Sequence, residues 1–158
     1  MIDPKTVMYD EGRRQALALQ ERAPAMTGTE LIAEEEKVPA WNPEKDYTGW
    51  KPGWPVADEG QVWTLIQPHN AAHYPSRPSG LRALWGLAHT TDPVKAKPWV
   101  ASYGTSGLYL INEVCTYPNA EGIVHIWRNL WDRNEFPPLT LNVESRWENL
   151  GEVGSYGL

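Results

Sequence analysis

The sequence has a single cysteine, Cys115, so no disulfide can form within the chain. Long hydrophobic runs are also missing, because no window approaches the ~20 apolar residues that a membrane span needs. Residues 1–5 lack the basic start and apolar run of a secretory signal. We therefore expect a protein that is made in the cytoplasm without a signal peptide and does not insert into a membrane.

Positive charge is scarce, with 14 Lys and Arg against 20 Asp and Glu and a formal net charge of −6. The basic residues are scattered singly, whereas a nucleic-acid binder gathers them on one face. A nucleic-acid partner is therefore not expected. Phenylalanine is nearly absent as well, with one residue, but there are nine tryptophans and seven tyrosines. Such rings combine a large apolar area with a polar handle, which suits small cores that border a wet surface.

The tryptophans fall in two runs of similar spacing. From Trp50, a glycine follows at +3, a valine at +6 and Trp63 at +13. From Tyr109, Asn112 stands at +3 and a cysteine at +6, and His125 takes the place of Trp63 after three extra residues. A closing tryptophan stands 22 residues after Trp63 and after His125. This spacing predicts an internal repeat of about fifty residues.

Residues 1–40 differ from the repeats and contain no tryptophan. Asp3-Pro4 predicts the N-cap and first residue of a helix over residues 6–22, which Pro24 ends. Thr27 and Glu30 form a capping-box pattern for a second short helix through about Glu36. Because such helices are marginal alone, we interpret the segment as a docking or oligomerisation segment, with a flexible leader as the alternative.

From residue 41 onward, short β segments alternate with turn residues. Residues 55–57 and 61–67 flank Asp58-Glu59-Gly60, which predicts a hairpin, and residues 113–117 and 123–129 repeat the pattern. Residues 81–89 fit either a short helix or an extended closing strand. The expected fold is mainly β, with two small tandem three-stranded antiparallel β modules after an α-helical N-terminal segment. The expected boundaries are residues 1–40 for the docking segment, 41–90 and 99–151 for the modules, 91–98 for the linker and 152–158 for a tail.

The order of a tryptophan, a Tyr-x-x-Gly-x-x-Val motif, a Gly-x-x-Tyr/Trp motif, a proline and a closing tryptophan resembles carbohydrate-binding module families 5 and 12. The matching residues are Trp41, Trp50, Gly53, Val56, Gly60, Trp63, Pro78 and Trp85 in the first module, and Trp99, Tyr109, Glu113, Gly122, His125, Pro137 or Pro138, and Trp147 in the second. The resemblance covers about two thirds of the chain and implies small chitin-binding-type β modules, which occur beside chitinases and in bacteriophage tail proteins. It also implies that the six framework tryptophans are core residues.

The sequence departs from the family pattern in two ways. The second module has Asn112 in place of the glycine and His125 in place of an aromatic residue, and because asparagine is the common substitute for glycine at positive φ, we expect the turn to be kept. The other departure bears on binding. Family members expose adjacent aromatic residues just after the hairpin tyrosine, whereas these places hold Gln67-Pro68 and Asn129-Leu130 here. The remaining rings are therefore the candidates for stacking on the CH faces of sugars. The candidate carbohydrate-binding residues are Trp127, Trp131, Trp54, Tyr74 and Tyr103. The alternative is that these rings fill space between the two modules or between subunits.

Catalytic and metal chemistry find little support. His69 and His73 are four residues apart, but no cysteine or carboxylate is spaced to complete a metal site. Asp58 and Glu59 lie in a hairpin turn rather than across a cleft, as the two carboxylates of a glycosidase must. We therefore expect no enzyme activity, no metal and no cofactor.

These patterns lead to a functional expectation. The chain is interpreted as a phage tail or baseplate-associated virion component whose modules contact a host cell-wall polysaccharide or surface glycan. Residues 1–40 would bind other tail proteins, and assembly as a homo-oligomer, such as a trimer, would add weak contacts together. The alternatives are a purely structural tail adaptor and a detached accessory module of a polysaccharide hydrolase system.

Overall fold

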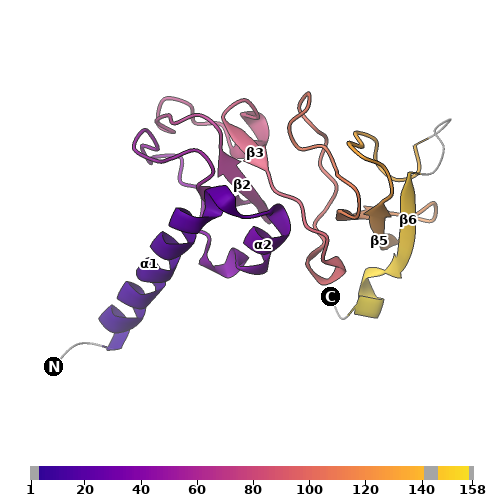
Figure 1. Cartoon of the computed structure of the whole chain (residues 1–158), viewed down its shortest axis with the longest axis horizontal. Coiled ribbons are helices and arrows are strands. Elements are labelled where there is room, and N and C mark those ends of the chain that lie inside the picture. The colour runs from indigo at the N-terminus through magenta and orange to yellow at the C-terminus, as the bar shows by residue number, and fades with distance from the viewer. Residues whose placement is uncertain (1–3, 141–145, 157–158) are drawn as a thin grey trace. The chain divides into compact units, whose positions relative to one another are not determined.

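The computed structural model describes residues 4–140 and 146–156, which divide into two compact units between Leu87 and Ala88 (Figure 1). The elements are α1 (Pro4–Arg22), η1 (Ala23–Ala25), α2 (Gly28–Ala33), η2 (Glu35–Lys37), β1 (Pro55–Asp58), β2 (Gln61–Leu65), η3 (Pro78–Gly80), β3 (Trp85–Leu87), η4 (Pro93–Lys95), β4 (Val114–Pro118), β5 (Val124–Asn129), β6 (Trp147–Glu152) and η5 (Val153–Tyr156). The first unit holds a three-stranded antiparallel sheet in the order β1-β2-β3, and the second holds another in the order β4-β5-β6. The expectation of a mainly β fold with two such sheets after a helical N-terminal segment is confirmed.

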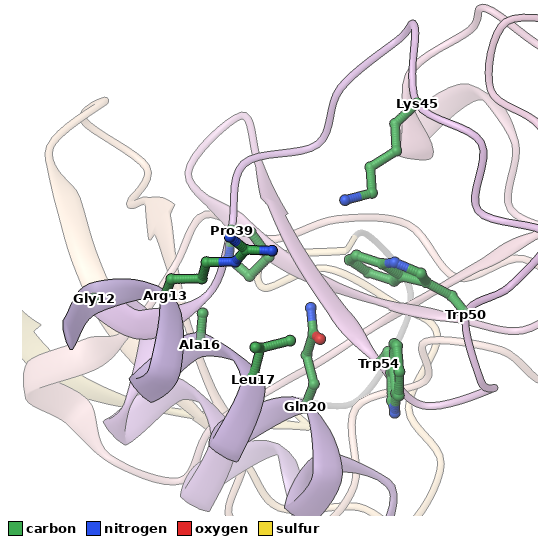
Figure 2. Close-up of a pocket in the computed structure, with 9 residues that line it drawn as sticks. All are labelled: Gly12, Arg13, Ala16, Leu17, Gln20, Pro39, Lys45, Trp50 and Trp54. Carbon is green, nitrogen blue, oxygen red and sulfur yellow. The ribbon is translucent and has the colours of Figure 1, made fainter. Parts of the chain in front are cut away.

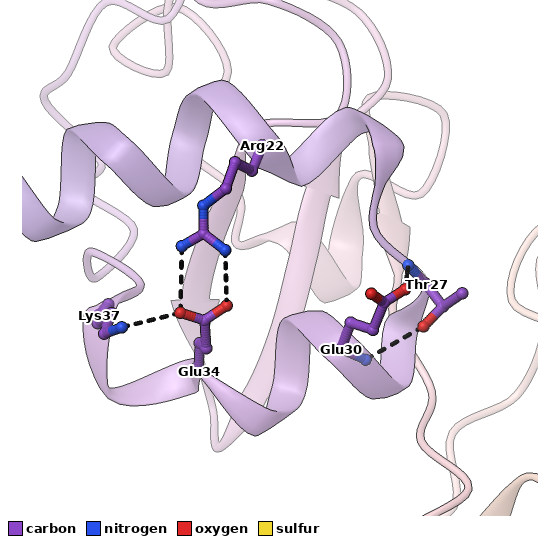
Figure 3. Close-up of polar contacts among 5 residues, drawn as sticks. All are labelled: Arg22, Thr27, Glu30, Glu34 and Lys37. Atoms are coloured by element: carbon purple, nitrogen blue, oxygen red, sulfur yellow. Dashed lines mark hydrogen bonds and ion pairs between the residues drawn. The ribbon is translucent and has the colours of Figure 1, made fainter.

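The N-terminal helices form where the capping residues place them. Helix α1 begins at Pro4 and ends at Arg22, as predicted, although the proposed N-cap Asp3 lies outside the described residues. The capping box is present, because the Glu30 N–H donates to Thr27 Oγ1 at 3.1 Å and the Thr27 N–H donates to a Glu30 carboxylate oxygen at 3.0 Å (Figure 3). Helix α2 ends at Ala33, earlier than predicted, and a 3-10 turn follows. None of the described helices is long and apolar enough to cross a membrane.

The second half of the N-terminal segment is packed into the first unit. Leu19, Leu31 and Ile32 are buried, whereas Leu17 is half exposed. A Cβ atom added to Gly53 would lie 3.0 Å from the Cα of Pro24, so the loop before β1 passes directly against the end of this segment. Gly53 also has a φ of +94°, so two independent constraints require glycine there. The marginal helices are therefore stabilised within the chain itself.

A small ion cluster joins α1 to the turn after α2. Glu34 accepts hydrogen bonds from two Arg22 guanidinium nitrogens, each at 3.1 Å, and from the Lys37 ammonium at 2.8 Å (Figure 3). The Arg22 and Lys37 hydrogen bonds lower the pKa of Glu34 from 4.5 to about 2. Because the folded chain holds this carboxylate ionised, the cluster stabilises the fold above the ordinary pKa and loses its effect as the pH falls toward 2.

We therefore predict an acid-dependent loss of stability that Glu34→Gln reduces. In urea denaturation at a series of pH values, the wild-type chain should lose stability between pH 4.5 and about 2. The variant should be less stable near neutral pH and should show a shallower decline across that window. Glu36→Gln, at an exposed position in the same turn, is the control and should decline like the wild type. Equal acid profiles for the Glu34 variant and the wild type would contradict the prediction.

Both predicted hairpins are confirmed. In the first, Glu59 and Gly60 have φ values of 53° and 73°, which is the left-handed pair that a two-residue type I′ turn requires. In the second, Gly122 has a φ of 82°, and the Asn119 side chain accepts the N–H groups of Glu121 and Ile123 at 3.0 and 2.9 Å. The closing segment of the first unit is extended, because Trp85 to Leu87 pair with β2.

Several backbone hydrogen bonds occur at matching places in the two units. The matching pairs are Trp41 N to Ala57 O and Trp99 N to Thr116 O, Gly53 N to Leu65 O and Asn112 N to Asn129 O, and Ile66 N to Leu84 O and Leu130 N to Arg146 O. Asn112 has a φ of 73°, so asparagine does replace glycine at a left-handed position, as expected.

The register of the sheets corrects one match made from spacing. Trp63 lies opposite Val56 on the neighbouring strand, and Trp127, not His125, lies opposite Cys115. The error arose because the second unit has extra residues before the end of β5 and fewer residues after it, so the two length differences partly cancel. Gly53 and Leu65 are 12 residues apart but the matching Asn112 and Asn129 are 17 apart, whereas the loop from β5 to the closing tryptophan is two residues shorter.

The tyrosines correct a second match. The Tyr47 and Tyr109 hydroxyls accept the backbone N–H of Asn42 at 2.9 Å and of Val100 at 3.2 Å, and each tyrosine ring meets the closing tryptophan of its sheet edge-on at 5.2 Å. Tyr47, rather than Trp50, therefore occupies the place of Tyr109. Trp50 is only half-buried, so its interpretation as a framework core residue was wrong. Trp41 and Trp99 are half-buried as well, whereas Trp63, Trp85 and Trp147 are buried as expected.

Cys115 is a core residue of the second unit. It is fully buried in the core of the second unit with Tyr109, Trp127 and Trp147. Burial raises the pKa of its thiol, so the reactive thiolate is disfavoured. Val56, at the matching place in the first unit, is fully buried as well.

Candidate functional site

The five predicted binding residues do not form one site. Trp54 lies in the first unit beside α1, Tyr74 lies in the loop after β2, and Tyr103 lies in a turn before β4. Trp127 and Trp131 are close in sequence, but β5 ends at Asn129, so they do not share one strand face.

Trp127 is a core residue. Its side chain is 6% exposed, and its indole N–H donates to the Tyr117 carbonyl at 2.9 Å. The indole of Trp63 donates in the same way to the Asp58 carbonyl at 3.2 Å. The prediction that Trp127 lies on a stacking surface with Trp131 does not fit this burial, because a sugar cannot reach an enclosed ring.

Trp131 is the exposed aromatic residue of the second unit that is held most firmly. The guanidinium carbon of Arg146 lies 3.9 Å from the centroid of the Trp131 ring and 4.5 Å from that of Phe136. Such contacts fix the orientation of an indole by cation–π attraction. Trp131 nevertheless remains 42% exposed, and since Arg146 covers one face, the exposed area belongs mainly to the other face and the edge.

A buried amide shapes the loops around Trp131. The Asn129 side chain is fully buried and donates to the carbonyls of Tyr109 and Leu110, each at 2.9 Å, and to that of Trp131. Its oxygen accepts the Trp131 N–H at 3.1 Å and the Asn134 amide at 3.0 Å. These bonds hold the loop before β4 next to the loop after β5.

The side chains displayed by these two loops are mostly apolar. Leu110, Ile111, Leu130 and Trp131 are all exposed. We call these four residues the Trp131 patch. Exposed apolar residues are ordinary singly, but a group held together by a buried polar network indicates a contact surface.

Tyr74 and Tyr103 are exposed rings that stand apart. Tyr74 is 51% exposed and meets His69 edge-on, with ring centroids 6.0 Å apart. Tyr103 is 57% exposed in a tight turn, where it exchanges two backbone hydrogen bonds with Ser106. Tyr74 belongs to the first unit, and Tyr103 lies in a different loop of the second unit from the Trp131 patch.

Trp54 lines an open cavity of about 590 Å³ in the first unit (Figure 2). Its ring meets Trp50 at 64° with centroids 5.5 Å apart, so the two indoles form a corner. Helix α1 supplies the opposite wall through Gly12, Arg13, Ala16, Leu17 and Gln20. Pro39 and Lys45 complete the lining.

The histidines and acidic residues form no metal-binding or catalytic cluster among the described residues. His69 is buried and His73 is exposed in a turn, so their spacing of four does not place them on a helix face. No three His, Cys, Asp or Glu side chains come together as metal ligands in the described part of the chain. Burial raises the pKa of Asp58, which Arg77 opposes, and burial raises the pKa of Glu113, which the Leu110 N–H opposes.

The chain was compared with known families, proteins and solved structures. No family model, no curated protein and no solved structure matches the chain. The functional argument therefore depends on the residues of the chain itself.

Sequence reasoning missed three residues of these surfaces. Trp50 was assigned to the core because its spacing matched Tyr109. A usable signal was that Tyr47, the true match, is a tyrosine like Tyr109. Arg146 and Gln20 gave no signal, because isolated basic and amide residues are common on protein surfaces.

Proposed function

We propose that the chain is a non-catalytic, glycan-binding virion component of a phage tail or baseplate, built from two tandem chitin-binding-type modules. The matching hydrogen bonds, left-handed positions and buried tryptophans of the two units support their origin as copies of one module. The resemblance to carbohydrate-binding module families 5 and 12 supports the ligand class and the virion setting. A host cell-wall polysaccharide or surface glycan is the proposed partner.

The observation that carries this proposal is the presentation of Trp131. Once Trp127 replaces His125 as the match to Trp63, the place where the family exposes aromatic residues moves by two positions and holds Trp131. The ring is backed by Arg146 and its loop is fixed by Asn129, so little ordering is needed when a sugar stacks on it. A preorganised, half-exposed indole is the form of aromatic platform that sugars bind.

Retention on insoluble chitin and on bacterial cell walls tests the proposal. The wild-type chain should be retained, and Trp131→Ala should weaken retention about tenfold or more, since exposed aromatic anchors dominate small interfaces. Leu139→Ala, which removes another exposed apolar side chain of the same unit, is the control and should be retained like the wild type. Lack of wild-type retention, or equal retention of both variants, would remove the glycan-binding half of the proposal.

A second candidate function is that of a structural tail adaptor. The exposed Leu110, Ile111 and Leu130 around Trp131, together with the exposed residues 10–15 of α1, favour protein contacts. In this case Leu110→Ser with Ile111→Ser should prevent particle assembly without changing retention on glycans. Residues 1–40 are the segment that we propose to contact other tail proteins. Assembly as a homo-oligomer would increase the avidity of weak glycan contacts.

A further inference from the structure

The cavity between α1 and the Trp50–Trp54 corner is a second candidate binding site in the chain. Its volume of about 590 Å³ falls in the range of about 300–1,000 Å³ that is usual for small-molecule sites. Figure 2 shows the side chains of Arg13, Leu17 and Gln20 reaching from α1 toward the cavity, with Lys45 on the other side. The site lies wholly within the first unit and does not involve the Trp131 patch.

The charge of this cavity is opposite to that of the chain. Its lining contains two cations, Arg13 and Lys45, and no acidic residue, although the chain has a net charge of −6. The Lys45 ammonium lies 5.1 Å from the Trp50 ring centroid, which keeps the charge beside the indole corner. Arg14 pairs with Glu11, whereas no described carboxylate pairs with Arg13. The two cations favour an anionic ligand.

A buried amide also faces the cavity. Gln20 is 6% exposed, and its amide extends into the space between Leu17 and Trp54 (Figure 2). None of the described residues supplies a hydrogen bond to this side chain, and its amide atoms are not fully enclosed, so the amide is open to the cavity. A ligand hydroxyl would satisfy it, since an amide can both donate and accept.

We infer that this cavity binds a carboxylated sugar residue, of the uronic acid type, within an acidic polysaccharide. The carboxylate would pair with Arg13 and Lys45, the apolar CH face of the ring would lie on the indole corner, and a hydroxyl would bind Gln20. A neutral sugar would leave both cations without a counter-charge, and a simple inorganic anion would leave the two indoles uncovered. The inference deepens the proposed glycan-binding function on which it rests, but it uses a separate site.

Isothermal titration calorimetry of the full chain at low salt tests this inference. The probes are trigalacturonate, a glucuronate-containing oligosaccharide, and the methyl ester of trigalacturonate, which keeps the rings and removes the charge. At least one acidic probe should bind, and the methyl ester should bind about tenfold or more weakly. Arg13→Gln and Lys45→Gln should each weaken binding about tenfold, because each removes a charged contact. Arg14→Gln, one residue away and outside the cavity, should bind like the wild type.

The same titrations separate this site from the Trp131 patch. Trp131→Ala should retain acidic-sugar binding, and Trp54→Ala should lose it. Gln20→Leu, which keeps the volume of the side chain, covers the case in which Trp54→Ala perturbs the fold, and it should weaken binding as well. Failure of both acidic probes to bind, equal binding of the methyl ester, or no effect of Arg13→Gln would overturn the inference. Retention on chitin that depends on Trp131 would in that event still support the proposed function.

Discussion

Trp85→Ala should destabilise the first unit by about 3–5 kcal/mol, one of the two largest losses that we expect from a single substitution in this chain. The Trp85 ring is fully buried and meets Tyr47 and His69 edge-on, at 5.2 and 5.4 Å between ring centroids. A unit of this size has little other core with which to fill the resulting cavity. Since small domains are stable by only about 5–15 kcal/mol, most of the stability of the unit should be lost.

Chemical denaturation, followed by hydrogen exchange of the β1, β2 and β3 amides, measures this loss. Trp131→Ala is the matched control, because it removes the same ring from an exposed position. It should cost about 1 kcal/mol, because the half-exposed ring loses mainly its cation–π contact with Arg146. A loss below about 1 kcal/mol for Trp85→Ala would mean that this ring does not form the core of the first unit.

Asn129→Leu should destabilise the second unit by about 3–5 kcal/mol. Leucine is the residue at the matching place of the first unit, Leu65, and it is nearly isosteric with asparagine. The substitution therefore leaves little cavity and isolates the polar effect. It removes the bonds that Asn129 makes to the Trp131 carbonyl, the Trp131 N–H and the Asn134 amide, whereas the Tyr109 and Leu110 carbonyls keep the N–H groups of Asn134 and Glu113. Each buried polar group left without a partner costs about 1–3 kcal/mol.

The Asn129 variant should also lose glycan retention, because its side chain fixes the loop that presents Trp131. Asn42→Ala is the control, since that exposed asparagine accepts only a local hydrogen bond from the Glu44 N–H. It should cost about 1 kcal/mol or less, as measured by urea denaturation. Wild-type stability of Asn129→Leu would contradict the role of this amide as the organiser of the Trp131 patch.

The local parts of the fold were predictable because their signals are short-range. A capping box and a Glu-Gly turn fix backbone angles within four residues, so Thr27, Glu30 and Gly60 located a helix and a hairpin correctly. The length of α2 was overestimated, because propensity alone does not mark where a short helix gives way to a 3-10 turn.

The register of the second sheet was not predictable from spacing. A longer hairpin and a shorter closing loop changed the spacing in opposite directions, so His125 fell where Trp127 belongs. This wrong register also affected the predicted site residues, because it placed Trp127 on the surface and Trp50 in the core. Trp131 and Trp54 stay candidate binding residues, because Trp131 is exposed and Trp54 lines an open cavity. Their partners Arg146 and Gln20 come from distant segments, which only the folded chain brings close.

The indole N–H resonances of the nine tryptophans provide the most direct test of the account. In a two-dimensional NMR titration with a chito-oligosaccharide, the Trp131 signal, assigned with Trp131→Phe, should shift as ligand is added. The signals of the enclosed rings Trp63, Trp85 and Trp127 should stay in place. Selective movement of the Trp131 signal is the result predicted by a preorganised glycan platform, whereas an unchanged Trp131 signal at saturating sugar would contradict it.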